Sequence, residues 1–396
     1  MDQSKLRAWW SHRQGLDGGL TGKSAGEVLE RTGWARSVGG CSPYLTLFSR
    51  ARISRDSADS DVAHVRIHEL PSARGCTYVL PSSDFALGLT LGQGFMGEIK
   101  VAEKLGVPGK EIDKLCDAVL AALEKGPLDP DGLREALGKA VRNLGPEGQK
   151  KGLTTTLPVA LGKLQTLGEI RRIPTNGRLD QQRYKYTLWR PNPLKNFKLS
   201  KDEAYAELAR KFFSWIGPAT IAEFQKFCAL GVKASKAAVE PLNLKPVEAD
   251  SEWLLAPADF DNFKAFKVPK EPQYALVGSI DSILLLRSSI KELLEGSDSG
   301  RQVFVDKGTK PIGELSDLPS HGILDRGRIV GLWEFDPATE TIAWTSFVKK
   351  DKALQSAVSQ TEEYVRGQLG DARSFGLDSP KSRSPRVEAL RKASGA

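Results

Sequence analysis

The chain has 396 residues, of which 27% are charged, 40% hydrophobic and 8% aromatic. This composition is ordinary for a globular protein, so it excludes a globally disordered chain, and the length predicts two to four domains. The N-terminus has no apolar signal region, and no apolar stretch approaches the ~20 residues of a membrane span. We therefore expect a cytoplasmic protein that is neither secreted nor inserted in a membrane.

The formal net charge of +8 is concentrated in two segments. Residues 150–190 contain nine basic and two acidic residues, and residues 372–396 contain six basic and two acidic residues. A local basic stripe on a nearly neutral body is typical of a surface that follows phosphates, because neutralised phosphates release counterions. The alternative is an ordinary solvated charged face.

Residues 1–97 predict helices followed by a β-hairpin, which is the order of a winged helix. Ser24 and Glu27 have the spacing of a capping box, before an amphipathic helix that stops at Gly33. Two short strands are expected over 66–69 and 76–80, on either side of a turn that contains Pro and Gly.

The same order of elements recurs over residues 105–197. Amphipathic stretches predict three helices, of which the last starts near Thr156. Strands over 170–173 and 183–189 flank a turn that contains Asn176-Gly177, a strong turn signal. This is the clearest hairpin in the chain.

The remaining sequence predicts one more winged helix and a different C-terminal unit. Residues 200–265 again show helices before a short strand pair, and residues 272–371 show alternating strands and a closing helix. Residues 372–396 are rich in Ser, Pro, Arg and Lys, so we expect a mobile basic tail. The predicted fold class is mainly α with β-hairpin wings (α+β), with three tandem winged-helix units followed by a small α+β unit.

The second hairpin alternates cations with aromatic residues, which places Arg183 and Lys185 on one face and Tyr184 and Tyr186 on the other. One face can dock on the domain while the other meets phosphate, as the wing of a winged helix does on a duplex. We predict double-stranded DNA as the partner, and the predicted contacts are Arg36, Arg74, Lys163, Arg171, Arg172, Arg178, Arg183 and Lys185.

The chain shows no convincing metal or nucleotide motif. The four cysteines lie far apart, without zinc-ligand spacing. The stretch Gly92 to Gly97 matches Gly-x-Gly-x-x-Gly, but it lacks a preceding strand and the downstream kinase motifs, so we interpret it as a flexible interdomain linker. We expect neither a metal nor a cofactor.

Several stretches resemble the crosslink-repair DNA glycosylases of the AlkZ-like (YcaQ-type) winged-helix family. They are Trp9-Trp10-x-His12-Arg13-Gln14-Gly15-Leu16, Ser42-Pro43-Tyr44-Leu45-x-Leu47-Phe48-x-Arg50-Ala51-Arg52, Ala73-Arg74-Gly75-Cys76-Thr77-Tyr78-Val79-Leu80-Pro81 and Gly217-Pro218-Ala219-Thr220. The resemblance covers roughly residues 1–260. It implies a bacterial, nucleoid-associated protein with three tandem winged helices around a DNA channel, which excises bulky alkylated purines and unhooks crosslinks without a metal.

The resemblance also implies a Gln-apolar-Gln or Gln-apolar-Asp motif after the second helix, where it holds and activates the attacking water. The matching stretch here reads Ala35-Arg36-Ser37. Ala offers no side-chain hydrogen bond, Arg cannot act as a base and Ser is a weak base, so we predict that the catalytic dyad is lost or replaced. If chemistry persists, Ser37 would position water and His68 or Glu69 would be the general base.

Three functional hypotheses follow from the sequence. The leading one is a winged-helix DNA-binding protein, expected to be a monomer, that recognises alkylated or crosslinked duplex DNA without excising the base. The second is an active, metal-independent N-glycosylase for alkylated bases. The third is a winged-helix transcriptional regulator with a ligand in the C-terminal unit, which would prefer one operator sequence.

Overall fold

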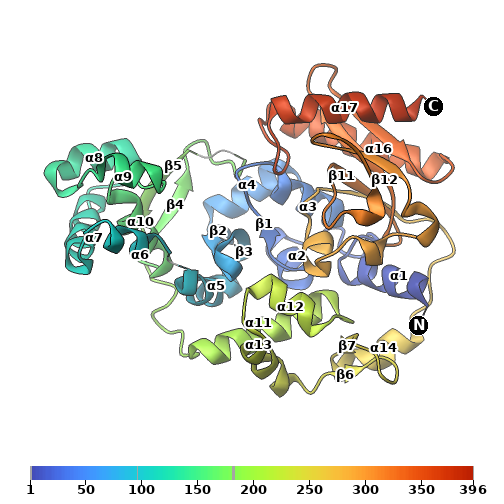
Figure 1. Cartoon of the computed structure of the whole chain (residues 1–396), viewed down its shortest axis with the longest axis horizontal. Coiled ribbons are helices and arrows are strands. Elements are labelled where there is room, and N and C mark those ends of the chain that lie inside the picture. The colour runs from blue at the N-terminus through green and yellow to red at the C-terminus, as the bar shows by residue number, and fades with distance from the viewer. Residues whose placement is uncertain (1, 96, 181–182, 396) are drawn as a thin grey trace.

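The computed structural model describes residues 2–95, 97–180 and 183–395. It contains helices together with several small antiparallel sheets, which confirms a mixed α+β fold. Figure 1 shows the first part of the chain in the centre, with the second at one end, the third below it and the C-terminal part above it. The number of winged-helix units and the unit boundaries stay predictions.

The first part, residues 1–97, combines helices with a three-stranded antiparallel sheet of order β1-β3-β2. The Ser24–Glu27 capping box is confirmed, because the Ser24 side chain accepts from the Glu27 amide and the Glu27 side chain accepts in return. The elements are α1 (Gln3–Arg13), α2 (Ala25–Thr32), β1 (Ala35–Arg36), α3 (Ser42–Ala51), α4 (Arg55–Ala63), β2 (Ile67–Pro71), β3 (Thr77–Pro81) and α5 (Phe85–Gly92).

The second part has a hydrophobic core of its own, built mainly from α7, α10 and their neighbours. The hairpin expected around Asn176-Gly177 is confirmed as an antiparallel pair, β4 and β5. The elements are α6 (Gly97–Lys104), α7 (Gly109–Leu123), α8 (Pro130–Leu137), α9 (Gly145–Lys150), α10 (Leu157–Thr166), β4 (Ile170–Pro174) and β5 (Tyr184–Leu188). The glycine-rich stretch that we interpreted as a linker includes the end of α5, a 3-10 turn over Gln93–Phe95 and the start of α6.

The third part packs two helices, α11 and α12, against the first part; α13 packs against these two helices, and a two-residue strand pair follows. Its elements are α11 (Lys201–Ile216), α12 (Ile221–Cys228), α13 (Val232–Val239), β6 (Lys245–Pro246), β7 (Leu254–Leu255) and α14 (Phe260–Ala265).

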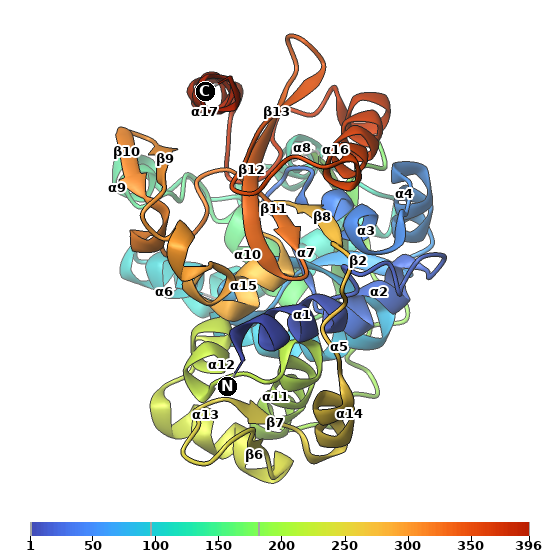
Figure 2. The ribbon, with the colours of Figure 1, turned by 90° about the vertical axis from the view of Figure 1, so that its right-hand side faces the viewer.

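The C-terminal part is built on a four-stranded antiparallel sheet of order β13-β12-β11-β8. Figure 2 shows α16 and α17 on opposite sides of this sheet, with the β9–β10 hairpin beside α17. The elements are β8 (Tyr274–Val277), α15 (Ser282–Arg287), β9 (Gln302–Val305), β10 (Gly308–Pro311), β11 (His321–Asp325), β12 (Arg328–Asp336), β13 (Thr341–Ser346), α16 (Lys352–Tyr364) and α17 (Pro380–Ser394).

The expectation of a mobile tail over 372–396 is wrong, because α17 packs against β12 and β13. Arg383, Val387 and Leu390 recur on one face of this helix, and all three are buried. Arg383 is also held by Asp378, whose Oδ2 lies 2.6 Å from the Arg383 Nε. The segment is poor in apolar residues, but the few that it has share one face, and a buried ion pair adds to them.

The first and C-terminal parts share two hydrophobic cores. Buried side chains from α2, α3, β11, β12 and α16 form one of them, and the other joins the first, third and C-terminal parts. Among the described residues, no helix is both long enough and apolar enough to cross a membrane.

Candidate functional site

A buried serine and a buried glutamate meet where the first part of the chain contacts the second. Ser37 follows β1 and is placed by its backbone amide, which donates to the carbonyl of Thr77 on β3 at 3.0 Å. Its hydroxyl donates to Oε1 of Glu69 on β2. The Glu69 side chain is only 7% exposed, so this hydroxyl–carboxylate pair is shielded from bulk water.

Arg172 completes this group from the other side of the interface. It lies on β4, and its Nη2 is 3.2 Å from Oε2 of Glu69, an ion-pair contact that does not have hydrogen-bond geometry. Its guanidinium lies 4.6 Å from the centre of the Tyr184 ring on β5. Burial, together with the neighbouring Glu69 charge, raises the pKa of Tyr184. We call Ser37, Glu69, Arg172 and Tyr184 the interface cluster.

The sequence reasoning named three of these four residues but not their contact. Tyr184 was missed as a site residue, although the alternation along β5 placed it on the face expected to dock on the domain. In the β4–β5 register, Arg172 lies opposite Tyr186 and Pro174 lies opposite Tyr184, so Arg172 and both tyrosines share that face. The alternation of side chains along β4 was the sequence signal for this arrangement, because it places Arg172 and Arg171 on opposite faces of the hairpin.

A cavity of about 250 Å³ adjoins the interface cluster, between the β2–β3 hairpin and helix α10. Arg172 lines it, together with Thr77, Phe95, Glu98 and Gln165. Burial raises the pKa of Glu98. The lining therefore mixes polar and apolar side chains, and Arg172 links it to the buried carboxylate of Glu69.

His68 does not join the cluster. It points to the opposite face of β2, where its ring lies 5.3 Å from Trp189 and 6.1 Å from Phe85, centre to centre. It is buried and neither ring nitrogen has a hydrogen-bond partner among the described residues. Burial, with the nearby charges of Arg171 and Arg172, lowers the pKa of His68 to about 3. His68 thus lies on the face of β2 opposite to Glu69, and its role as a general base stays a prediction.

Three of the predicted DNA contacts, the half-buried Arg171 and the exposed Arg183 and Lys185, form a cationic face on the β4–β5 hairpin. Arg171 lies opposite Thr187, and Ile173 lies opposite Lys185, so Arg171 and Lys185 share the face that points away from the cluster. Arg183 precedes β5 at the same period and is exposed, as is Lys185. Arg171, Arg183 and Lys185 form no ion pair within the described part of the chain. We call these three the cationic face.

The other predicted contacts are less available to phosphate. Arg178 pairs with Asp180 and with Asp371 of the C-terminal part, at 2.5 and 2.7 Å. The Lys163 ammonium pairs with Asp113 on α7, which raises the pKa of Lys163. Asp113 and Asp371 are far from these cations in the sequence, whereas Asp180 is only two residues from Arg178.

Two predicted contacts lie near the β2–β3 hairpin. The Arg36 guanidinium donates to the carbonyl of Thr77 at 2.9 Å and lies 5.3 Å from the Tyr78 ring centre. Arg74 sits in the hairpin turn, is exposed and has a φ of 60°. Arg74 is therefore accessible to phosphate, whereas Arg36 is hydrogen-bonded to the backbone of β3.

The described residues contain no group of three or more His, Cys, Asp and Glu side chains that could hold a metal ion.

Comparison with known proteins gives matches to a protein family and to solved structures. The sequence profile of a family described as DNA glycosylase AlkZ-like matches residues 39–364. Among solved structures, the fold is similar to that of the Streptomyces sahachiroi DNA glycosylase AlkZ, with a TM-score of 0.69 and 19% sequence identity. The match covers 93% of this chain and 97% of that one. No curated protein sequence shows significant similarity.

Proposed function

Because this chain belongs to the AlkZ-like DNA glycosylase family, we propose that it is a DNA repair protein that recognises alkylated or crosslinked duplex DNA without excising the base. In this proposal the cationic face follows the phosphates and the interface cluster stands where the relatives carry their catalytic dyad. Residues 1–97, 105–197 and 200–265 would act as tandem winged helices of a monomeric, nucleoid-associated protein.

The observation that supports this proposal is that both carboxylate oxygens of Glu69 contact other side chains of the protein. One carboxylate oxygen accepts from Ser37, and the other contacts Arg172 at 3.2 Å. A base that activates water must have an oxygen free to reach that water, and both Glu69 oxygens already contact protein groups. Within the described part of the chain, Ser37 has no basic partner other than this same carboxylate. The cluster is thus suited to joining two parts of the fold beside the lesion rather than to hydrolysis.

The experiment uses a duplex with a single N7-alkylguanine beside an undamaged duplex of the same sequence. Binding is measured by gel shift, and excision is measured both as free base released and as strand scission after alkali. We expect the damaged duplex to bind more tightly and neither product to exceed the level in the same duplex without protein. Release of the alkylated base by the purified protein would overturn the proposal.

One observation favours a second function, an active metal-independent N-glycosylase. Glu69 is a buried carboxylate that contacts Arg172, a residue that lines a cavity, and carboxylates close to the sugar stabilise oxocarbenium-like transition states. This function predicts base release that Glu69→Gln abolishes, while binding to the same duplex persists. Loss of release in Glu69→Gln but not in Arg36→Gln would assign the chemistry to the carboxylate.

A further inference from the structure

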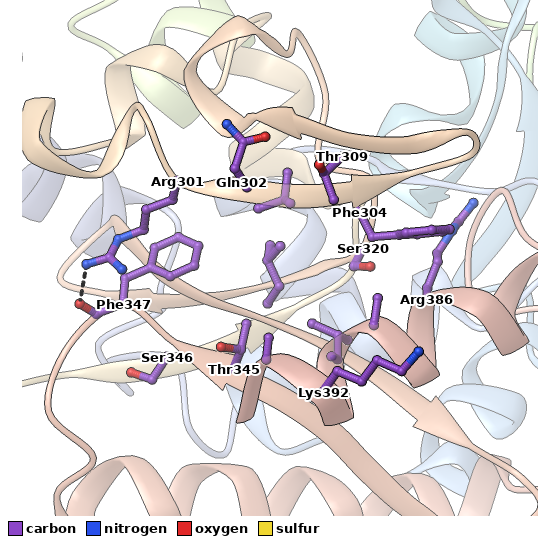
Figure 3. A pocket seen from close by; sticks show the side chains of 15 residues that line it. Arg301, Gln302, Phe304, Thr309, Ser320, Thr345, Ser346, Phe347, Arg386 and Lys392 are labelled. Atoms are coloured by element: carbon purple, nitrogen blue, oxygen red, sulfur yellow. Dashed lines mark hydrogen bonds between the residues drawn. The ribbon is translucent and has the colours of Figure 1, made fainter. Parts of the chain in front are cut away.

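A larger cavity lies in the C-terminal part, away from the cationic face and the interface cluster. It has a volume of about 640 Å³, within the range of small-molecule sites. Its walls are the β9–β10 hairpin, the sheet strands β12 and β13, and helix α17. Figure 3 shows side chains from all of these elements around one open space.

The lining is apolar in the middle and cationic at its ends. Val303, Leu332 and Leu390 contribute apolar side chains from β9, β12 and α17. Arg301 and Arg386 lie at opposite ends of the cavity in Figure 3, and Lys392 adds a third cation. None of the fifteen lining residues is acidic. A ligand bound here is therefore favoured if it is an anion with an apolar body.

The guanidinium N–H groups of Arg386 are available to donate hydrogen bonds to such an anion. It makes no hydrogen bond within the described part of the chain. Its nearest carboxylates, on Asp306 and Glu334, are 3.6 and 3.7 Å away. By contrast, the Arg301 guanidinium already donates to Asp298 at 2.6 Å and to the carbonyl of Phe347 at 3.0 Å. The planar fork of Arg386 matches the two oxygens of a carboxylate.

The wall behind Arg386 also holds polar groups without a hydrogen bond. Glu334 lies two residues after Leu332 on β12, so it shares the face that lines the cavity, and its side chain is 1% exposed. Neither of its oxygens has a hydrogen-bond partner among the described residues, and the same holds for Nε2 of His321, 3.8 Å away. Burial raises the pKa of Glu334 to about 7. Buried polar atoms in this state indicate a site that a ligand completes.

We propose that this cavity binds a small organic carboxylate, whose apolar body lies on Val303, Leu332 and Leu390 and whose carboxylate pairs with Arg386. Lys392 and Arg301 add positive potential at the rim. The binding is a property of the C-terminal part and is independent of whether the protein excises bases from DNA.

The test is calorimetric titration of the full chain with 2-naphthoate and with 2-naphthalenemethanol, its neutral analogue of similar size. We expect the acid to bind about tenfold or more tightly than the alcohol, since a hydrogen-bonded charge pair in a partly desolvated site contributes at least that much. Arg386→Gln should remove the preference for the acid and leave the affinity for the alcohol unchanged.

A cavity-filling variant provides evidence that does not depend on the charge of Arg386. Ala389, on the cavity face of α17, is replaced by Trp, which should abolish binding of both probes. Ser384→Trp and Lys381→Gln are the matched controls, because both residues are exposed on α17 and neither lines the cavity. These two variants should bind both probes as the original protein does.

Each remaining outcome contradicts the proposal. Equal affinity for acid and alcohol would mean an apolar cavity without anion selectivity. Unchanged binding in Ala389→Trp, with thermal unfolding like that of the original protein, would place the probe elsewhere. The absence of saturable binding of 2-naphthoate and of decanoate at millimolar concentration would mean that the cavity is not a carboxylate site.

Discussion

Arg50 on α3 and Asp281 before α15 form a fully buried, two-pronged ion pair across 231 positions of sequence, with N–O distances of 2.7 and 2.8 Å. Gln14 extends the pair, because its Oε1 accepts from Arg50 at 2.9 Å. Its amide nitrogen donates to the carbonyls of Thr32 and Trp215. One polar network therefore joins the first, third and C-terminal parts of the chain.

Replacing Arg50 by Met is expected to lower the free energy of unfolding by about 3–5 kcal/mol, because it leaves the Asp281 carboxylate buried without its partner. Urea unfolding followed by tryptophan fluorescence measures the change. The exposed Arg210–Glu207 pair on α11 is the control, and Arg210→Met should cost about 1 kcal/mol or less. Equal effects of the two substitutions would contradict the assigned role of the buried network.

The cationic face predicts a specific salt dependence of DNA binding. Changing Arg171, Arg183 and Lys185 to Gln should weaken duplex binding and reduce the slope of log K against log salt by about 3, near one counterion for each lost phosphate contact. The charge-matched control changes the exposed lysines Lys233, Lys236 and Lys245 of the third part. If both triple variants shift the slope alike, the β4–β5 hairpin has no special part in binding.

Arg178 is predicted to stabilise the fold rather than to bind DNA. Its partner Asp180 has a side chain that is 1% exposed, whereas the side chain of Asp371 is 66% exposed. Arg178→Met should therefore cost about 3 kcal/mol or more by leaving Asp180 buried and unpaired, while Asp371→Asn should cost about 1 kcal/mol or less. Thermal unfolding distinguishes the two. A large loss of DNA affinity in a stable Arg178→Met protein would restore Arg178 to the interface with DNA.

His68 predicts an acid sensitivity of the fold. Its pKa is about 3 in the folded protein and near 6.5 when unfolded, so the unfolded state binds the proton more tightly. The stability from a neutral His68 is present above pH 6.5 and is lost as the pH falls toward 3. Between pH 7.5 and 4 this loss is about 3 kcal/mol.

The matched measurement is urea unfolding of His68→Gln at both pH values. This variant should lose about 3 kcal/mol less on acidification than the original protein. His64→Gln, at an exposed position, should keep the original dependence. An unchanged pH dependence in His68→Gln would show that His68 is not the group that titrates.

Local signals in the sequence identified most of the helices and the main hairpins. Capping at Ser24 and the Asn176-Gly177 turn depend on residues only a few positions apart, so their effect can be read without tertiary contacts. The short apolar strands β8 and β11 were missed, since their stability comes from pairing with each other and with β12. Helix α17 was missed because its few apolar residues acquire a partner only when the sheet is formed.

The sequence by itself determined the family, the mixed fold, the basic hairpin with its two different faces, and Ser37 and Glu69 as candidate site residues. Only the tertiary structure decided that Glu69 meets Arg172, that Arg178 is paired with carboxylates and that His68 is buried away from Ser37. The physical reason is the separation along the chain over which each kind of interaction acts. Periodicity and capping act over a few residues, whereas ion pairs and desolvation depend on which distant side chains share a buried space.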